Sequence, residues 1–86
     1  MIDDAAIKQQ FGRRVKELRA ARGWSQERLA EESSLHRTYV AQVEVGLRNL
    51  SLVSIVRLAR ALHVPAAAIF GLIDQDNGNP LGRPPP

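Results

Sequence analysis

Apolar residues recur every three to four positions along most of this chain, and no segment alternates regularly between polar and apolar residues. Near the N-terminus the recurring apolar positions are Ile7, Phe11, Val15 and Leu18. This spacing places them on one side of a helix, which we expect over about residues 4–22. Gly23 can adopt the left-handed conformation that closes such a helix.

A second and a third helix are predicted close together. Ser25 can cap the second helix by accepting a backbone N–H. A short polar break at Ser33-Ser34 separates it from the third helix, which starts near His36 and ends at Gly46. Two helices joined by so tight a turn form a helix-turn-helix, whose second helix can enter the major groove of DNA.

The C-terminal half predicts two more helices and a tail. Ser51 can cap a fourth helix, whose apolar positions are Leu52, Ile55, Val56, Leu58, Ala59 and Leu62. Pro65 leads into a short fifth helix, "AAAIF". The remainder is rich in Gly, Pro, Asn and Asp and cannot continue as helix. We therefore expect an all-α, compact five-helix domain over residues 1–71 and a tail over residues 72–86.

Composition and charge narrow the class of protein. The chain has 86 residues, 44% of them hydrophobic and 24% charged, which is typical of one small soluble domain. Neither a secretory signal nor an apolar run long enough to cross a bilayer is visible, so we expect a cytoplasmic protein without a membrane partner. The formal charge of +3 and the pI of about 10.2 suit an anionic partner.

Catalysis has little support in the sequence. The chain contains two histidines and no cysteine, and it lacks a Gly-rich phosphate loop and a carboxylate pair beside a nucleophile. We therefore predict that the protein is not an enzyme and uses no metal and no cofactor.

The third helix carries the residue types that read DNA. Arg37 and Gln42 provide the forked hydrogen-bonding groups that distinguish bases, and Thr38 can contact a thymine methyl or a phosphate. Tyr39 can reach a phosphate with its hydroxyl while its ring leans on the domain. The alternative interpretation is that these side chains only form a solvated helix surface, with Tyr39 partly in the core.

Two longer stretches give more specific support for DNA binding by the third helix. The segments are "RAARGWSQERLA" over residues 19–30 and "TYVAQVEVGLRNLSL" over residues 38–52. In register, they resemble the phage-repressor and Cro family of lambda-repressor-like regulators, also called the xenobiotic-response-element type. The resemblance extends from about Phe11 to Phe70. It implies a helix-turn-helix formed by the second and third helices.

The resemblance also implies roles for individual residues. Those expected to contact bases are Gln26, Arg37, Thr38 and Gln42. Those expected to contact the DNA backbone are Ser25, Tyr39, Arg48 and Asn49. Apart from the resemblance, we also expect His36 to reach a phosphate. Glu44 matches a family glutamate that braces the loop after the third helix. Ser34 and His36 depart from the family pattern, because relatives often have Gly at the first position and Ser or Asp at the second.

The implied function is that of a sequence-specific transcriptional regulator, acting as a homodimer on a palindromic operator in double-stranded DNA. The motifs "RTY" and "RNLS" resemble those of the controller proteins of restriction-modification systems. An apolar surface is expected to form the dimer interface, from Leu62, Val64, Ile69, Phe70, Leu72 and Ile73. The alternative is an antitoxin-like module that chiefly binds a partner protein. RNA polymerase or a small protein are further candidate partners.

Overall fold

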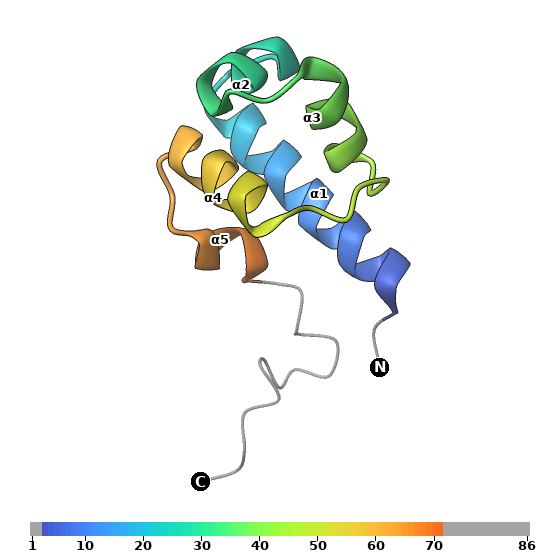
Figure 1. Ribbon diagram of the computed structural model, residues 1–86. Helices are drawn as coiled ribbons and strands as arrows, with labels where there is room; N and C mark the ends of the chain where they lie inside the picture. Colours follow the sequence, from blue (N-terminus) through green and yellow to red (C-terminus); the bar gives the residue numbers. More distant parts are fainter. Residues whose placement is uncertain (1–2, 72–86) are drawn as a thin grey trace, which may run out of the picture.

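Five helices make up the fold in the computed structural model, which describes residues 3–71 (Figure 1). They are α1 (Asp4–Ala21), α2 (Gln26–Ser33), α3 (Arg37–Glu44), α4 (Leu52–Ala61) and α5 (Ala66–Phe70). The long helix α1 packs against α3 and α5, while α2 packs against α3 and α4. Within this part of the chain, no helix combines the length and hydropathy needed to span a bilayer. The predicted all-α class is confirmed, and the predicted tail lies outside the described residues.

Side-chain caps fix the starts of three helices. The oxygen of each cap accepts a backbone N–H three residues on: Asp3 from Ala6 at 2.8 Å, Ser25 from Arg28 at 3.0 Å and Ser51 from Ser54 at 3.1 Å. The two serine caps were predicted and are confirmed. His36, at the start of α3, makes no such bond, so α3 depends more on tertiary packing than on its own cap.

Four helices end on a residue with left-handed backbone conformation. These residues are Gly23 after α1 (φ 70°), as predicted, Ser34 after α2 (φ 58°), Gly46 after α3 (φ 83°) and His63 after α4 (φ 57°). At each end the next backbone N–H donates to a carbonyl five residues back, as in a Schellman motif: Trp24 to Arg19, Leu35 to Ala30, Leu47 to Gln42 and Val64 to Ala59. Only glycine adopts this conformation without strain, so Ser34 and His63 carry a local cost.

The core gathers apolar side chains from all five helices. Its buried members are Phe11, Val15, Leu29, Ala30, Val40, Val43, Leu58, Ala59, Ala61, Leu62 and Ile69. Two positions of the predicted apolar stripes are exposed, because Ile7 is 37% and Leu52 is 76% exposed. Both stand in the first turns of their helices, where fewer neighbouring elements cover them.

Helices α1 and α3 approach so closely that their backbones touch. A Cβ atom added to Gly12 of α1 would lie 2.1 Å from the carbonyl oxygen of Val43 in α3. No side chain fits in that space, so the glycine is required by the approach itself. The position of α3 on the domain is therefore set by backbone contact as well as by side chains.

Arginines of α1 and of its C-terminal cap bind other parts of the fold. Arg14 Nε of α1 donates to the carbonyl of Ala68 at 3.0 Å, and Nη1 of the cap residue Arg22 donates to the carbonyl of Leu62 at 3.3 Å. These two guanidinium groups help to hold α5 and the end of α4 against α1. Arg19 of α1 binds a buried carboxylate of α3.

Candidate nucleic-acid interface

The first turn of α3 presents two predicted base-contacting residues to solvent. Arg37 and Thr38 are both exposed. Arg37 Nε lies 3.9 Å from Glu27 Oε1, but the two side chains are 67% and 71% exposed. An ion pair this long and this exposed contributes at most about 1 kcal/mol. Arg37 is therefore free to exchange this partner for another one.

Gln42, one turn further along α3, is tied to the loop that follows the helix. Its Oε1 accepts a hydrogen bond from Arg48 Nε at 2.8 Å. The guanidinium carbon of Arg48 also lies 4.9 Å from the centroid of the Tyr39 ring. Arg48 thus connects Tyr39, on which it stacks, with Gln42, to which it donates. From the sequence we had expected Gln42 to contact a base and the other two residues to contact phosphates.

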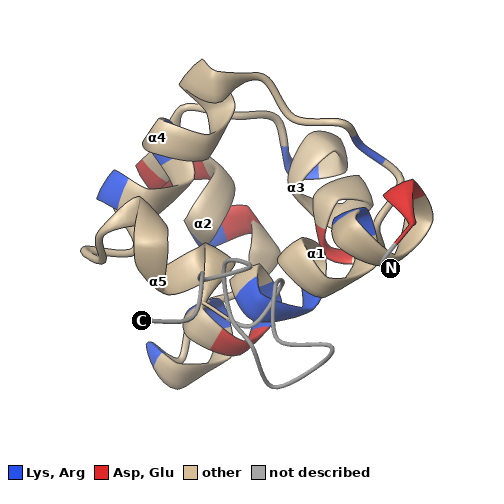
Figure 2. Cartoon of the chain, turned by 90° about the horizontal axis from the view of Figure 1, so that it is seen from below, with Lys and Arg blue, Asp and Glu red and all other residues tan. Residues whose placement is uncertain are grey.

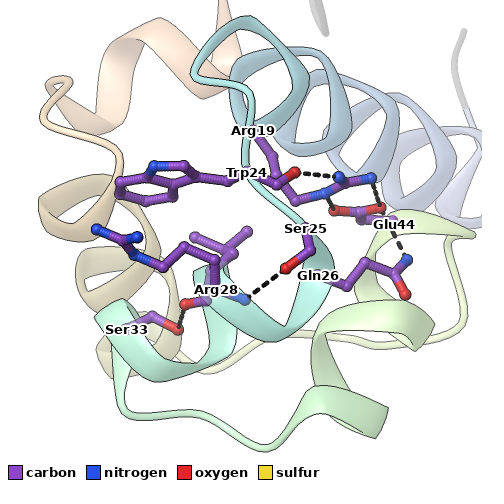
Figure 3. A network of polar contacts seen from close by, with 8 residues as sticks. Arg19, Trp24, Ser25, Gln26, Arg28, Ser33 and Glu44 are labelled. Atoms are coloured by element: carbon purple, nitrogen blue, oxygen red, sulfur yellow. Dashed lines mark hydrogen bonds and ion pairs between the residues drawn. The ribbon is translucent and has the colours of Figure 1, made fainter.

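Gln26 is held by a buried charge network at the junction of α1, α2 and α3 (Figure 3). Glu44 accepts from Arg19 Nε at 2.6 Å, from Arg19 Nη2 at 3.0 Å and from Gln26 Nε2 at 3.0 Å. Arg19 Nη1 also donates to the carbonyl of Trp24 at 2.7 Å. The oxygen of the Gln26 amide points away from Glu44 (Figure 3).

Glu44 therefore has a structural role, though in a different place from the one expected. We expected it to brace the loop after α3. Instead its carboxylate, with a side chain only 2% exposed, joins α3 to α1 and to the start of α2. The hydrogen bond from Arg19 to Glu44 and the charge of Glu44 raise the pKa of Arg19, against the opposing effect of burial. The pairing thus favours the charged guanidinium.

Trp24 and Ser25 form the short connection between α1 and α2. The Trp24 ring packs against the core and lies 4.8 Å from the guanidinium carbon of Arg22 and 5.0 Å from that of Arg28. Trp24 is therefore a packing residue at the junction of α1 and α2. The hydroxyl oxygen of Ser25 is used to cap α2, and a phosphate contact by Ser25 stays a prediction.

A concave surface that encloses a volume of about 510 Å³ lies between α3 and α4. Its lining residues are Ser34, Leu35, His36, Thr38, Tyr39, Arg48, Ser54 and Arg57. It brings together four of the predicted DNA contacts, namely His36, Thr38, Tyr39 and Arg48. Asn49 is exposed but lines a separate groove.

Two residues of this surface were missed by the sequence analysis. Ser54 and Arg57 stand on α4, three residues apart and hence on one face of the helix. They interrupt the apolar pattern of that helix, and this polar pair at helical spacing was the signal that could have identified them. A concave surface with two guanidinium groups and several hydroxyls suits a phosphate group.

Positive charge is spread over several elements rather than collected on one helix (Figure 2). Acidic residues lie among the basic ones, and some neutralise them directly: Arg28 pairs with Glu32 at 2.9 Å and Arg14 with Glu17 at 3.4 Å. The exposed arginines beside the concave surface, Arg48 and Arg57, are therefore more informative about a partner than the formal charge of the chain.

The predicted dimer interface needs correction. Leu62 and Ile69 are 1% and 0% exposed in the single chain, so they belong to its core and have no surface left to bury. Helical periodicity identified them as apolar but could not show that the same chain covers them. Val64 is half-buried against the core, while Phe70 is 40% exposed. Leu72 and Ile73 lie outside the described residues.

Other apolar side chains are exposed near the same helices. Leu52 and Val53, at the start of α4, are 76% and 59% exposed. Ile55 of α4 and Phe70 of α5 line one small groove, together with Ile7, Lys8, Phe11, Arg48, Asn49 and Leu50. Apolar surface of this kind on a small domain is typical of a protein interface.

Comparison with known proteins places these features in a family. Residues 15–69 match the helix-turn-helix family HTH_3. The chain belongs to this helix-turn-helix family. The predicted resemblance is confirmed, and α2 and α3 are the two helices of the motif.

Relatives of this helix-turn-helix protein share most of its length. Control protein C.BamHI of Bacillus amyloliquefaciens is 46% identical over 55 residues, which are 63% of this chain and 68% of that protein. Control protein C.MunI of a Mycoplasma species is 35% identical over 71 residues, covering 81% and 96% of the two chains. The crystal structure of the restriction-modification controller protein C.AhdI from Aeromonas hydrophila superposes with a TM-score of 0.71 at 52% identity, over 72% of this chain and 94% of that one.

Proposed function

We propose that this protein is a sequence-specific DNA-binding transcriptional regulator that acts as a homodimer on a palindromic operator and controls a restriction-modification operon. The observation that carries the proposal is the exposure of Arg37 and Thr38 at the first turn of α3, the second helix of the motif. The relatives called control or controller proteins support the choice of operon.

In this proposal α3 enters the major groove with its N-terminal turn foremost. Arg37 then contacts base edges, because its only described ion pair is the long, exposed one with Glu27. The concave surface receives a phosphate, with Arg48 and Arg57 as the charged groups and Ser54 as a hydroxyl donor. The buried Arg19–Glu44 pair keeps α3 fixed on α1 while α3 is in the groove.

The proposed dimer uses a different set of residues from the one first expected. Two copies are needed to cover two half-sites about one turn of DNA apart. Exposed Leu52, Val53 and Phe70, which lie on α4 and α5, offer the apolar surface for this contact. Additional contacts with RNA polymerase or a small partner protein stay predictions.

The decisive experiment measures binding of Arg37→Ala to the operator and to each single-base variant of it. Loss of a base-reading arginine should cost about 1–3 kcal/mol and relax discrimination at one base pair. Arg13→Ala, an exposed residue of α1 outside the concave surface, is the matched control for lost positive charge. If Arg37→Ala discriminates among all variants as the parent does, the base-reading role of α3 is wrong.

A second variant tests the phosphate contact separately. Arg57→Ala should weaken binding to all sequences by the same factor and lower the slope of log affinity against log salt by about one. A sequence-dependent loss in this variant would contradict the assignment of Arg57 to the backbone.

A further inference from the structure

The two ends of the Gln42 amide are not equally available. A glutamine side chain has one acceptor oxygen with two lone pairs and an NH₂ group with two donor hydrogens. In this structure Oε1 already accepts from Arg48 Nε at 2.8 Å. The oxygen and nitrogen diverge from Cδ in the amide plane, so the NH₂ group is the part of the amide that is turned away from Arg48.

Arg48 is itself held in a defined orientation. Its guanidinium carbon lies 4.9 Å from the centroid of the Tyr39 ring, and Tyr39 packs against the core. The stacking and the hydrogen bond to Gln42 together fix the guanidinium plane. An arginine has five N–H donors and no acceptor, so the Nη groups that remain can only donate.

From this arrangement we infer that Tyr39, Arg48 and Gln42 act as one unit that offers hydrogen-bond donors, and that α3 selects guanine over adenine where Gln42 meets DNA. The inference rests on the proposed function. Guanine presents two acceptors, N7 and O6, in the major groove, whereas adenine presents the acceptor N7 and the donor N6. A free glutamine satisfies adenine by using both ends of its amide. Here Arg48 takes one of the two lone pairs of Oε1 and places a cationic group that can only donate beside that oxygen. Adenine N6, which is also a donor, must then approach against the guanidinium, whereas the acceptors of guanine face donors alone.

The inference assigns Arg48 a second role besides its predicted phosphate contact. A purely electrostatic contact supports every sequence alike, whereas a residue that orients Gln42 changes which base is preferred. Tyr39 likewise becomes a positioning residue, because its ring supports the guanidinium. Specificity at one base pair would then depend on a loop residue outside α3.

The test uses the full chain and a pool of duplex DNA with randomised half-sites. Selection gives the preferred operator, and Gln42→Ala identifies the base pair that depends on Gln42. At that base pair the parent should bind the duplex with guanine about tenfold more tightly than the duplex with adenine. Arg48→Met should shift this ratio toward adenine by about tenfold and leave the preferences at other positions unchanged.

Two further variants separate orientation from charge and from folding. Arg48→Lys keeps the positive charge but lacks the planar fork, so it should shift the ratio as Arg48→Met does while keeping more of the overall affinity. In a Gln42→Ala background, Arg48→Met should change no base preference. Because Arg48 is exposed, each variant should retain the thermal midpoint of the parent, which circular dichroism checks.

Two results would overturn the inference while leaving the regulator intact. One is an equal loss of affinity for all sequences in Arg48→Met. The other is a parent that prefers adenine at the Gln42-dependent position. A parent that selects no sequence from the pool would instead overturn the proposed function itself.

Discussion

Replacing Glu44 with alanine removes the acceptor at the centre of the buried network between α1, α2 and α3. The carboxylate receives two hydrogen bonds from Arg19 and one from Gln26. The Arg19 side chain is 14% exposed, so water cannot fully replace the lost partner. Of its described hydrogen-bond partners, only the carbonyl of Trp24 would remain.

The expected cost follows from this burial. Removing one partner of a buried ion pair destabilises a protein by about 3–5 kcal/mol, because the other charge stays uncompensated. A domain of this size has a total stability of about 4–10 kcal/mol. The Glu44→Ala variant should therefore lose about a third or more of its free energy of unfolding, with a thermal midpoint lower by about 12 °C or more.

Urea unfolding followed by circular dichroism measures this loss, and the chain supplies a matched control. Arg28 and Glu32 form an ion pair at 2.9 Å with side chains 52% and 40% exposed. Glu32→Ala should cost less than about 1 kcal/mol. The contrast between the two variants isolates the effect of burial, since both remove a carboxylate that binds an arginine.

A double variant tests the cause. Arg19→Met combined with Glu44→Met removes both charges, so it should be more stable than the sum of the two single losses predicts, by about 1–3 kcal/mol. Because the pKa of Arg19 is raised, its contribution to stability is fully present at every pH below the ordinary pKa of arginine and is lost only at still higher pH. Titration of this guanidinium therefore adds no pH dependence near neutrality. Equal costs for Glu44→Ala and Glu32→Ala, or strict additivity in the double variant, would refute the reasoning.

Three further variants test other features. Gly12→Ala should lose about 3 kcal/mol or more in urea unfolding, because its Cβ would meet the Val43 carbonyl at 2.1 Å; an unchanged midpoint would contradict the close approach. His63→Gly should raise the thermal midpoint, gaining up to about 1 kcal/mol by relieving a φ of 57°, and a lower midpoint would contradict this. Glu27→Gln should tighten DNA binding several-fold at low salt by releasing Arg37 and removing a negative charge, and fluorescence anisotropy showing weaker binding would oppose it.

Local signals explain why the helices could be predicted so closely. Ser25 and Ser51 accept the backbone N–H groups that a cap must satisfy, and Gly46 has the positive φ that ends α3. Each signal acts within a few residues, so it can be recognised without the rest of the fold. The exposure of Arg37 and Thr38 follows for the same reason, because their place in the first turn was visible in the sequence.

Local signals of this kind do not predict contacts between residues that are far apart in the sequence. Arg19 and Glu44 lie 25 residues apart, and nothing in the local pattern joins them. Leu62 and Ile69 were assigned to an interface because periodicity shows that a face is apolar, but not whether the same chain covers it. The bond between Arg48 and Gln42 depends on the path of a loop, which no helix period describes.

The contact of Gly12 with the backbone of α3 has a consequence for how this protein could be redesigned. Since main-chain atoms set the docking of α3, exposed positions such as 37 and 38 can change without tilting the helix that bears them. If α3 reads DNA as proposed, a few surface replacements should change the preferred sequence and leave the position of the helix as it is. An engineer who wishes to retarget the protein should therefore vary those side chains and leave position 12 untouched.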